Sequence, residues 1–169
     1  MNDPAADAPH PPTTTFNILF VCTGNTCRSP LAEGIARREL KERGWRHVRV
    51  ASAGLAAQPG GGASDNACTI AARHGISLEE HGTRLLEPSM LEWADLVLAM
   101  SPGHVDAVIA MGGGEKVALL SAFAAGDGVP ARGVRDPFGG PLQAYENTYR
   151  QLHELIGASF DRLEPILHP

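Results

Sequence analysis

The feature that most constrains the fold is a strand, a short loop and a helix start near the N-terminus. The apolar run at residues 16–21 indicates a buried strand. Ser29 and Pro30 are typical of a helix start, with Ser29 as the N-cap and Pro30 at the first helical position. A turn from strand to helix at this point favours a sheet in which strands and helices alternate. The segment that makes the turn reads Cys22-Thr23-Gly24-Asn25-Thr26-Cys27-Arg28-Ser29.

The residue types in this turn suit a nucleophile beneath a bound oxyanion. Backbone N–H groups of the loop and the helix N-terminus favour phosphate. The guanidinium of Arg28 can hold two phosphate oxygens, and the same positive field favours the thiolate of Cys22. Gly24 and Asn25 tolerate the positive φ that a tight anion cradle needs. The alternative is a structural turn with a buried cysteine, but the combined pattern favours a catalytic Cys22 acting on a phosphorylated substrate.

The rest of the chain alternates strands with helices. Periodicity and cap signals predict strands over 48–53, 95–100 and 116–120, and helices over 30–44, 64–75, 86–93 and 101–109. An irregular segment over 121–141 precedes a last helix with apolar positions from 145 to 163. This order predicts a three-layer α/β fold, a parallel sheet with helices on both faces, formed by one domain over 16–167. Residues 1–15 are rich in Pro, Ala and Thr and predict a disordered tail.

Composition excludes several classes of protein. The formal net charge of −5, with no basic block, argues against nucleic acid as a partner. No apolar stretch reaches membrane-spanning length, and the first residues lack the pattern of a signal peptide, so the cytoplasm is expected. Three cysteines, two of them in one loop, do not suit a disulfide framework. The seven histidines are dispersed, so we expect no metal and no cofactor.

A second candidate site residue, Asp136, lies in the irregular segment before the last helix. Long irregular loops in compact domains are usually functional. A carboxyl group held beside a phosphate favours its protonated form and could protonate a leaving group. Pro137 would stiffen the loop, and Phe138 could form a pocket wall. Taken alone, this motif is more typical of a proline turn that leads into a helix.

Together these motifs resemble the low-molecular-weight protein tyrosine phosphatase family, from about Asn17 to Leu163. The likeness rests on residues 22–30, Ser52-Ala53-Gly54, the run 94–100 and Asp136-Pro137. It implies a four-stranded parallel sheet of flavodoxin-like type and a phosphocysteine intermediate. It also implies roles for the site residues: Cys22 as nucleophile, Arg28 as phosphate binder, Asp136 as general acid, Asn25 shaping the loop, and Ser29 hydrogen-bonded to the thiolate.

Thr26 favours one branch of that family. Many phosphotyrosine members have an apolar residue at this position, whereas Thr26 and the run 136–140 resemble the protein-arginine phosphatases. A hydroxyl can hydrogen-bond a guanidinium leaving group, while isoleucine favours an aromatic ring. The second aromatic residue often found after Asp-Pro is Gly139 here, and Ala56 and Ala57 lack an aromatic wall. We therefore expect phosphoarginine in proteins as the substrate, with phosphotyrosine as the alternative and Thr26 and Phe138 setting the choice.

Two other functions are weaker alternatives. Thiol-dependent arsenate reductases share the loop but need a second cysteine pair later in the chain, and here only Cys68 remains, within a predicted helix. A non-catalytic phosphopeptide-binding module would not need Asp136.

We also expect Cys27 to protect Cys22 from irreversible oxidation by forming a disulfide with it. His81 and His104 are expected at the surface, with His81 shaping a loop near the site as the alternative, and the protein is expected to be a monomer.

Overall fold

The computed structural model describes residues 15–126 and 132–167, so nearly all of the expected N-terminal tail lies outside the described residues. The strands are β1 (Phe16–Cys22), β2 (Val48–Gly54), β3 (Leu96–Ala99) and β4 (Val117–Leu119). The α-helices are α1 (Arg28–Arg43), α2 (Asp65–Arg73), α3 (Pro88–Trp93), α4 (Pro102–Ala110), α5 (Leu120–Ala125) and α6 (Leu142–Leu167). A single 3-10 turn, η1 (Gly114–Lys116), precedes β4.

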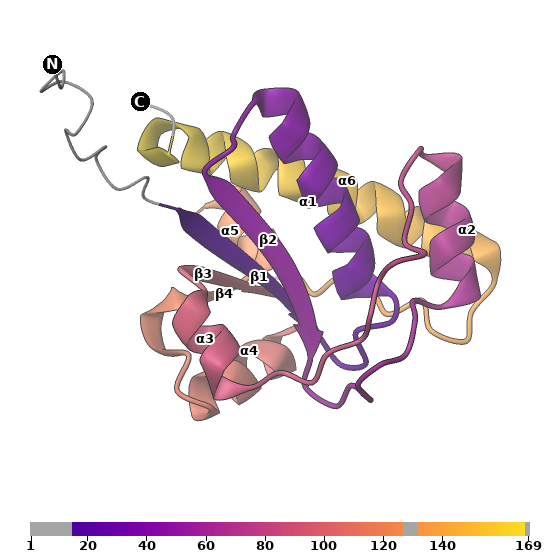
Figure 1. Cartoon of the computed structure of the whole chain (residues 1–169), viewed down its shortest axis with the longest axis horizontal. Helices are drawn as coiled ribbons and strands as arrows, with labels where there is room; N and C mark the ends of the chain where they lie inside the picture. Colours follow the sequence, from indigo (N-terminus) through magenta and orange to yellow (C-terminus); the bar gives the residue numbers. More distant parts are fainter. Residues whose placement is uncertain (1–14, 127–131, 168–169) are drawn as a thin grey trace, which may run out of the picture.

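The four strands form one parallel sheet in the order β2-β1-β3-β4. Ile18 of β1 pairs with Val50 on one side and with Leu96 on the other. Helices α1, α5 and α6 cover one face, with α2 packed against α1 and α6, and α3 and α4 cover the other face (Figure 1). The expected three-layer fold with helices on both faces is confirmed.

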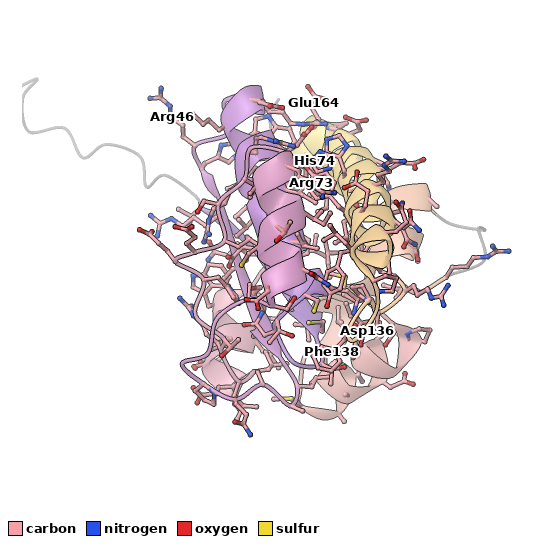
Figure 2. All side chains as sticks on the ribbon, turned by 90° about the vertical axis from the view of Figure 1, so that its right-hand side faces the viewer. Arg46, Arg73, His74, Asp136, Phe138 and Glu164 are labelled. Atoms are coloured by element: carbon pink, nitrogen blue, oxygen red, sulfur yellow. The ribbon has the colours of Figure 1, made fainter. Side chains whose placement is uncertain are left out.

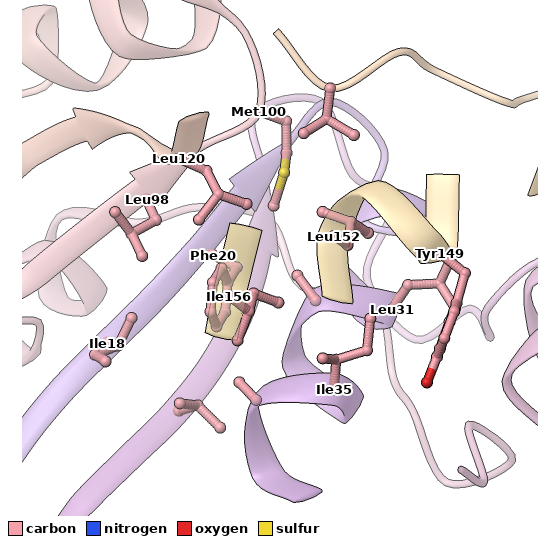
Figure 3. Close-up of a cluster of buried hydrophobic side chains, with 14 of the residues drawn as sticks. Ile18, Phe20, Leu31, Ile35, Leu98, Met100, Leu120, Tyr149, Leu152 and Ile156 are labelled. Carbon is pink, nitrogen blue, oxygen red and sulfur yellow. The ribbon is translucent and has the colours of Figure 1, made fainter. Parts of the chain in front are cut away.

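The protein has one hydrophobic cluster on each face of the sheet. Strand β1 contributes side chains to both clusters because alternate side chains of a strand point to opposite faces of the sheet. Ile18 and Phe20 are fully buried beneath α1 and α6, where Figure 3 shows Phe20 among side chains such as Leu152 and Ile156. Leu19 and Val21 face the smaller cluster under α3 and α4. Strand β1 is paired on both sides and buried on both faces, so the loop that follows it starts from a well-packed position.

Two details of the expected secondary structure are wrong. Helix α1 begins at Arg28, and its N-cap is Cys27, which makes no side-chain cap bond. The Ser29 hydroxyl does not cap the helix because it is hydrogen-bonded to Cys22 and Asn25 instead. The segment 121–141 is not wholly irregular, since α5 covers its first residues with Leu120 buried in the core.

The loop after β1 lies directly against the end of β2. Backbone N–H groups of Leu55 and Ala56 donate to the carbonyl oxygens of Cys22 and Thr23 at 3.0 and 2.9 Å. This contact is close because Gly54 has no side chain. A Cβ placed there would lie 2.5 Å from the Thr23 carbonyl oxygen and 2.8 Å from the Asn25 nitrogen. Both are backbone atoms, so they could yield only if the loop itself moved.

We predict that Gly54→Ala destabilises the protein by about 1–3 kcal/mol, the usual cost of overpacking a tight contact. The matched control is Gly62→Ala, because a Cβ at Gly62 would meet no atom within 4 Å. That variant should stay within about 0.5 kcal/mol of the wild type. Urea unfolding of the three proteins measures the difference. Equal stability of both variants would show that the loop does not depend on this close approach.

Candidate active site

Asn25 occupies the centre of the loop over residues 23–27 and holds it in shape. Its φ is 58°, a left-handed conformation that asparagine tolerates better than most residues, and its side chain is fully buried. Its Nδ2 donates to the hydroxyls of Ser29 and Ser52 at 2.8 and 3.0 Å. Its Oδ1 accepts from the Arg84 N–H at 2.9 Å. One amide side chain therefore connects the loop, the start of α1, β2 and the segment before α3.

His81 supports the same turn from outside, because its Nε2 lies 2.8 Å from the Asn25 carbonyl oxygen. His81 is partly exposed and hydrogen-bonded, and the partner of this bond fits the alternative of a loop-shaping role. The ring reaches the loop because the segment over 81–84 lies beside it, where Arg84 also bonds to Asn25. The sequence suggested this role only as an alternative, since the contact joins residues far apart along the chain.

Cys22 ends β1 with its sulfur 2.9 Å from the Ser29 hydroxyl oxygen, and the residue is only 3% exposed. The bond expected between these two side chains is therefore present. Because Asn25 donates to the Ser29 oxygen, the hydroxyl hydrogen of Ser29 is available to the sulfur. This chain of donors suits a sulfur that carries negative charge.

Arg28 and Asp136 meet at the mouth of the site. The Nη2 of Arg28 lies 3.4 Å from Oδ2 of Asp136, and its Nη1 donates to the Val134 carbonyl at 3.1 Å. The Arg28 side chain is 8% exposed and the Asp136 side chain 49%. The other carboxylate oxygen of Asp136 accepts from the Phe138 N–H at 3.1 Å. Arg28 and Asp136, which are far apart in the sequence, therefore lie together in the structure as expected.

Most of the predicted site residues line one pocket of about 180 Å³, but Asn25 and Ser29 do not. Phe138 forms its outer wall as expected, and its ring is 72% exposed. Figure 2 shows Asp136 and Phe138 together at one end of the molecule, away from Arg46 and Glu164. A larger groove, of about 740 Å³ along β2, contains none of the predicted site residues. The lining of the smaller pocket is Cys22, Thr23, Gly24, Thr26, Cys27, Arg28, Asp136 and Phe138.

His104 also belongs to this site, although it was expected on the helix surface. It is 7% exposed, and its Nε2 lies 2.8 Å from the Thr23 hydroxyl oxygen. Burial lowers the pKa of His104, and the charge of Arg28 lowers it further, while Asp136 acts in the opposite direction. A signal for this contact does exist in the sequence. His104 lies in the first helical turn after β3, and ligands of parallel sheets bind at the carboxyl ends of strands.

The second loop cysteine, Cys27, is buried and contacts hydroxyl groups of residues outside the loop. Its sulfur lies 3.3 Å from the Ser64 hydroxyl and 3.5 Å from the Tyr145 hydroxyl. Cys22 and Cys27 are both free thiols, so their protective disulfide stays a prediction. Cys68 is only partly buried, rather than buried as an inert core thiol would be, and burial raises the pKa of its thiol.

The described residues contain neither a cluster of metal-ligating side chains nor a helix that could span a membrane. Within 15–126 and 132–167, no group of three or more His, Cys, Asp or Glu side chains could hold a metal ion. None of the helices in that part of the chain is both long and apolar enough to cross a membrane.

Comparison with known proteins identifies the family of this chain. The family model described as low molecular weight phosphotyrosine protein phosphatase matches residues 17–165. A protein-arginine-phosphatase of Bacillus subtilis is 39% identical, over 83% of this chain and 92% of that protein. The low molecular weight protein-tyrosine-phosphatase PtpB of Staphylococcus epidermidis is 34% identical, over 83% of this chain and 94% of its own length.

Solved structures agree with the sequence matches. A mutant of the YwlE arginine phosphatase that carries a phosphorylated active-site serine superposes with a TM-score of 0.82. It is 36% identical to this chain, over 88% of this chain and 96% of its own. A second structure, a YwlE mutant from Bacillus subtilis, superposes with a TM-score of 0.83 at 35% identity, over 89% of this chain and 99% of its own. This chain therefore belongs to the low-molecular-weight phosphotyrosine protein phosphatase family of cysteine-dependent phosphatases.

Proposed function

We propose that this phosphatase hydrolyses phosphoarginine in proteins, with Cys22 as its nucleophile. The observation that carries the proposal is the single pocket in which Cys22, Arg28, Asp136 and Thr26 converge. A nucleophile, a phosphate-binding cation, an acid and a polar wall are the groups that this reaction needs. The named protein-arginine-phosphatase relatives support the same substrate.

In the first step, the Cys22 sulfur attacks phosphorus and the P–N bond to the arginine side chain breaks. Arg28 binds two oxygens of the phosphoryl group, which replaces its present contact with Asp136. Asp136 gives its proton to the departing nitrogen. The products are a phosphocysteine and a free arginine side chain, with the enzyme carboxyl group left as a carboxylate.

In the second step, water attacks the phosphorus of the phosphocysteine. The Asp136 carboxylate takes a proton from this water, the P–S bond breaks, and inorganic phosphate leaves. The sulfur departs as a thiolate, and the Ser29 hydroxyl, 2.9 Å away, is placed to donate to it. Asp136 is half exposed, so water can reach it.

The pocket walls favour phosphoarginine over phosphotyrosine. Thr26 lines the pocket and supplies a hydroxyl for the guanidinium. The aromatic side chain in the lining is that of Phe138, and neither Ala56 nor Ala57 contributes to it. Phosphotyrosine is the second candidate substrate, because the exposed Phe138 ring could stack on a phenyl group. The PtpB relative is also named a protein-tyrosine-phosphatase.

The remaining alternatives fit the site less well. Asp136, placed 3.4 Å from Arg28 at the pocket mouth, is a group that a purely phosphopeptide-binding module would not need. An arsenate reductase would need a second thiol pair, and Cys68 lies within α2, where its sulfur contacts the Ala63 carbonyl.

We predict that Thr26→Ile lowers kcat/KM for phosphoarginine and raises it for phosphotyrosine. Exchanging a hydroxyl for a larger apolar group in a pocket usually discriminates by about 1–3 kcal/mol, roughly tenfold to a few hundredfold. The matched control is Thr26→Ser, which keeps the hydroxyl and should keep the preference. Both substrates are compared side by side on wild type and variants. A wild-type enzyme that prefers phosphotyrosine would contradict the phosphoarginine proposal and favour the tyrosine-phosphatase alternative.

We predict that Asp136→Asn lowers kcat by about 10²–10⁴-fold, the usual contribution of a general acid. The loss should shrink for aryl phosphates with good leaving groups, because these depart without protonation. Asp106→Asn, on the exposed surface of α4, is the control and should leave kcat unchanged. A loss of kcat of the same size for good and poor leaving groups would show that Asp136 is not the general acid.

A further inference from the structure

We propose that His104 is a positioning residue that makes Thr23 a direct ligand of the bound phosphoryl group. In this arrangement, His104 donates its Nε2–H to the Thr23 oxygen, and the Thr23 hydroxyl hydrogen then points into the pocket. The inference rests on the proposed function and deepens it, because it adds a side-chain donor to the oxyanion cradle. Its basis is the 2.8 Å contact between the two side chains.

The fold brings these two residues together. Strand β3 pairs with β1, so the helix that follows β3 begins beside the loop that follows β1. The Ser101 hydroxyl accepts the His104 N–H at 3.3 Å and fixes the first turn of α4. Thr23 follows the nucleophile directly and lines the pocket. Among the described residues, His104 supplies the side chain that is hydrogen-bonded to the Thr23 hydroxyl.

The tautomer of His104 decides the direction of this hydrogen bond. Burial and the nearby Arg28 lower the pKa of the ring, so His104 is neutral at neutral pH and carries one N–H. Its Nδ1 is buried with no hydrogen-bond partner among the described residues. A buried N–H without a partner is rarer in proteins than a buried acceptor without one. The proton is therefore placed on Nε2, where the Thr23 oxygen accepts it.

This direction leaves the Thr23 hydroxyl hydrogen free. A threonine hydroxyl has one donor and two acceptor positions, and His104 occupies an acceptor position. The donor can then serve an oxyanion in the pocket that Thr23 and Arg28 both line. The opposite tautomer would direct the Thr23 hydrogen at His104 and remove this donor from the pocket. His104 thus acts through Thr23, without itself touching the substrate.

The test measures the affinity for inorganic phosphate by calorimetry, which needs no turnover. We compare the wild type with Thr23→Val, His104→Leu, the double variant and His104→Gln. A hydrogen bond to a charged group is expected to change the affinity by roughly tenfold to a hundredfold. Each of the first two variants should lose about that factor, and the double variant should lose no more than either. His104→Gln should restore most of the affinity, because its amide nitrogen can occupy the place of Nε2.

Three results would overturn the inference. One is a Thr23→Val variant that binds phosphate as tightly as the wild type, and another is a double variant whose losses add. The third is a His104→Gln variant that loses as much affinity as His104→Leu, which would indicate a packing role. If His104→Leu does not fold, Thr23→Val and His104→Gln decide the question. A wild type that binds phosphate without hydrolysing phosphoproteins would overturn the proposed function instead, and the binding series would still test Thr23.

Discussion

The buried amide of Asn25 is the interaction on which the site depends. It holds its own backbone in the left-handed region and ties the loop to Ser29, Ser52 and the Arg84 N–H. A buried amide with fully matched donors and acceptors rigidifies what it connects, because any rearrangement leaves a polar group unpaired. The orientation of the Ser29 hydroxyl toward the Cys22 sulfur is a direct consequence of this network.

The sheet explains why so few residues build the site. With the order β2-β1-β3-β4, the carboxyl end of β1 lies between the ends of β2 and β3. Gly54 of β2 has no side chain and so leaves space for the loop. His104 contacts the loop from the helix that follows β3. The segment before α6 supplies the Val134 carbonyl and Asp136, which both bind Arg28. Each neighbouring segment contributes short-range contacts, and together they define the pocket.

Much of this arrangement could be predicted from the sequence. Alternating strands and helices, with the residue types of 22–30, indicated the fold class and the cradle, since periodicity and cap signals are local. The helix start at Arg28 was missed because the Ser29 hydroxyl binds Cys22 instead of capping the helix. The loop contact of His81 was expected only as an alternative, and the contact of His104 was missed, because both join residues distant in sequence. The short helix α5 was missed within a segment dominated by Gly and Ala.

The proposed mechanism requires that Cys22 carries the phosphoryl group between the two steps. Rapid quenching of the enzyme during turnover of a phosphoarginine protein, followed by mass spectrometry of the peptide that contains Cys22, tests it most directly. We expect a phosphoryl group on the Cys22 sulfur, and neither phosphoenzyme nor turnover in a Cys22→Ala variant. Turnover that persists in that variant, or a phosphoryl group on another residue, would contradict it.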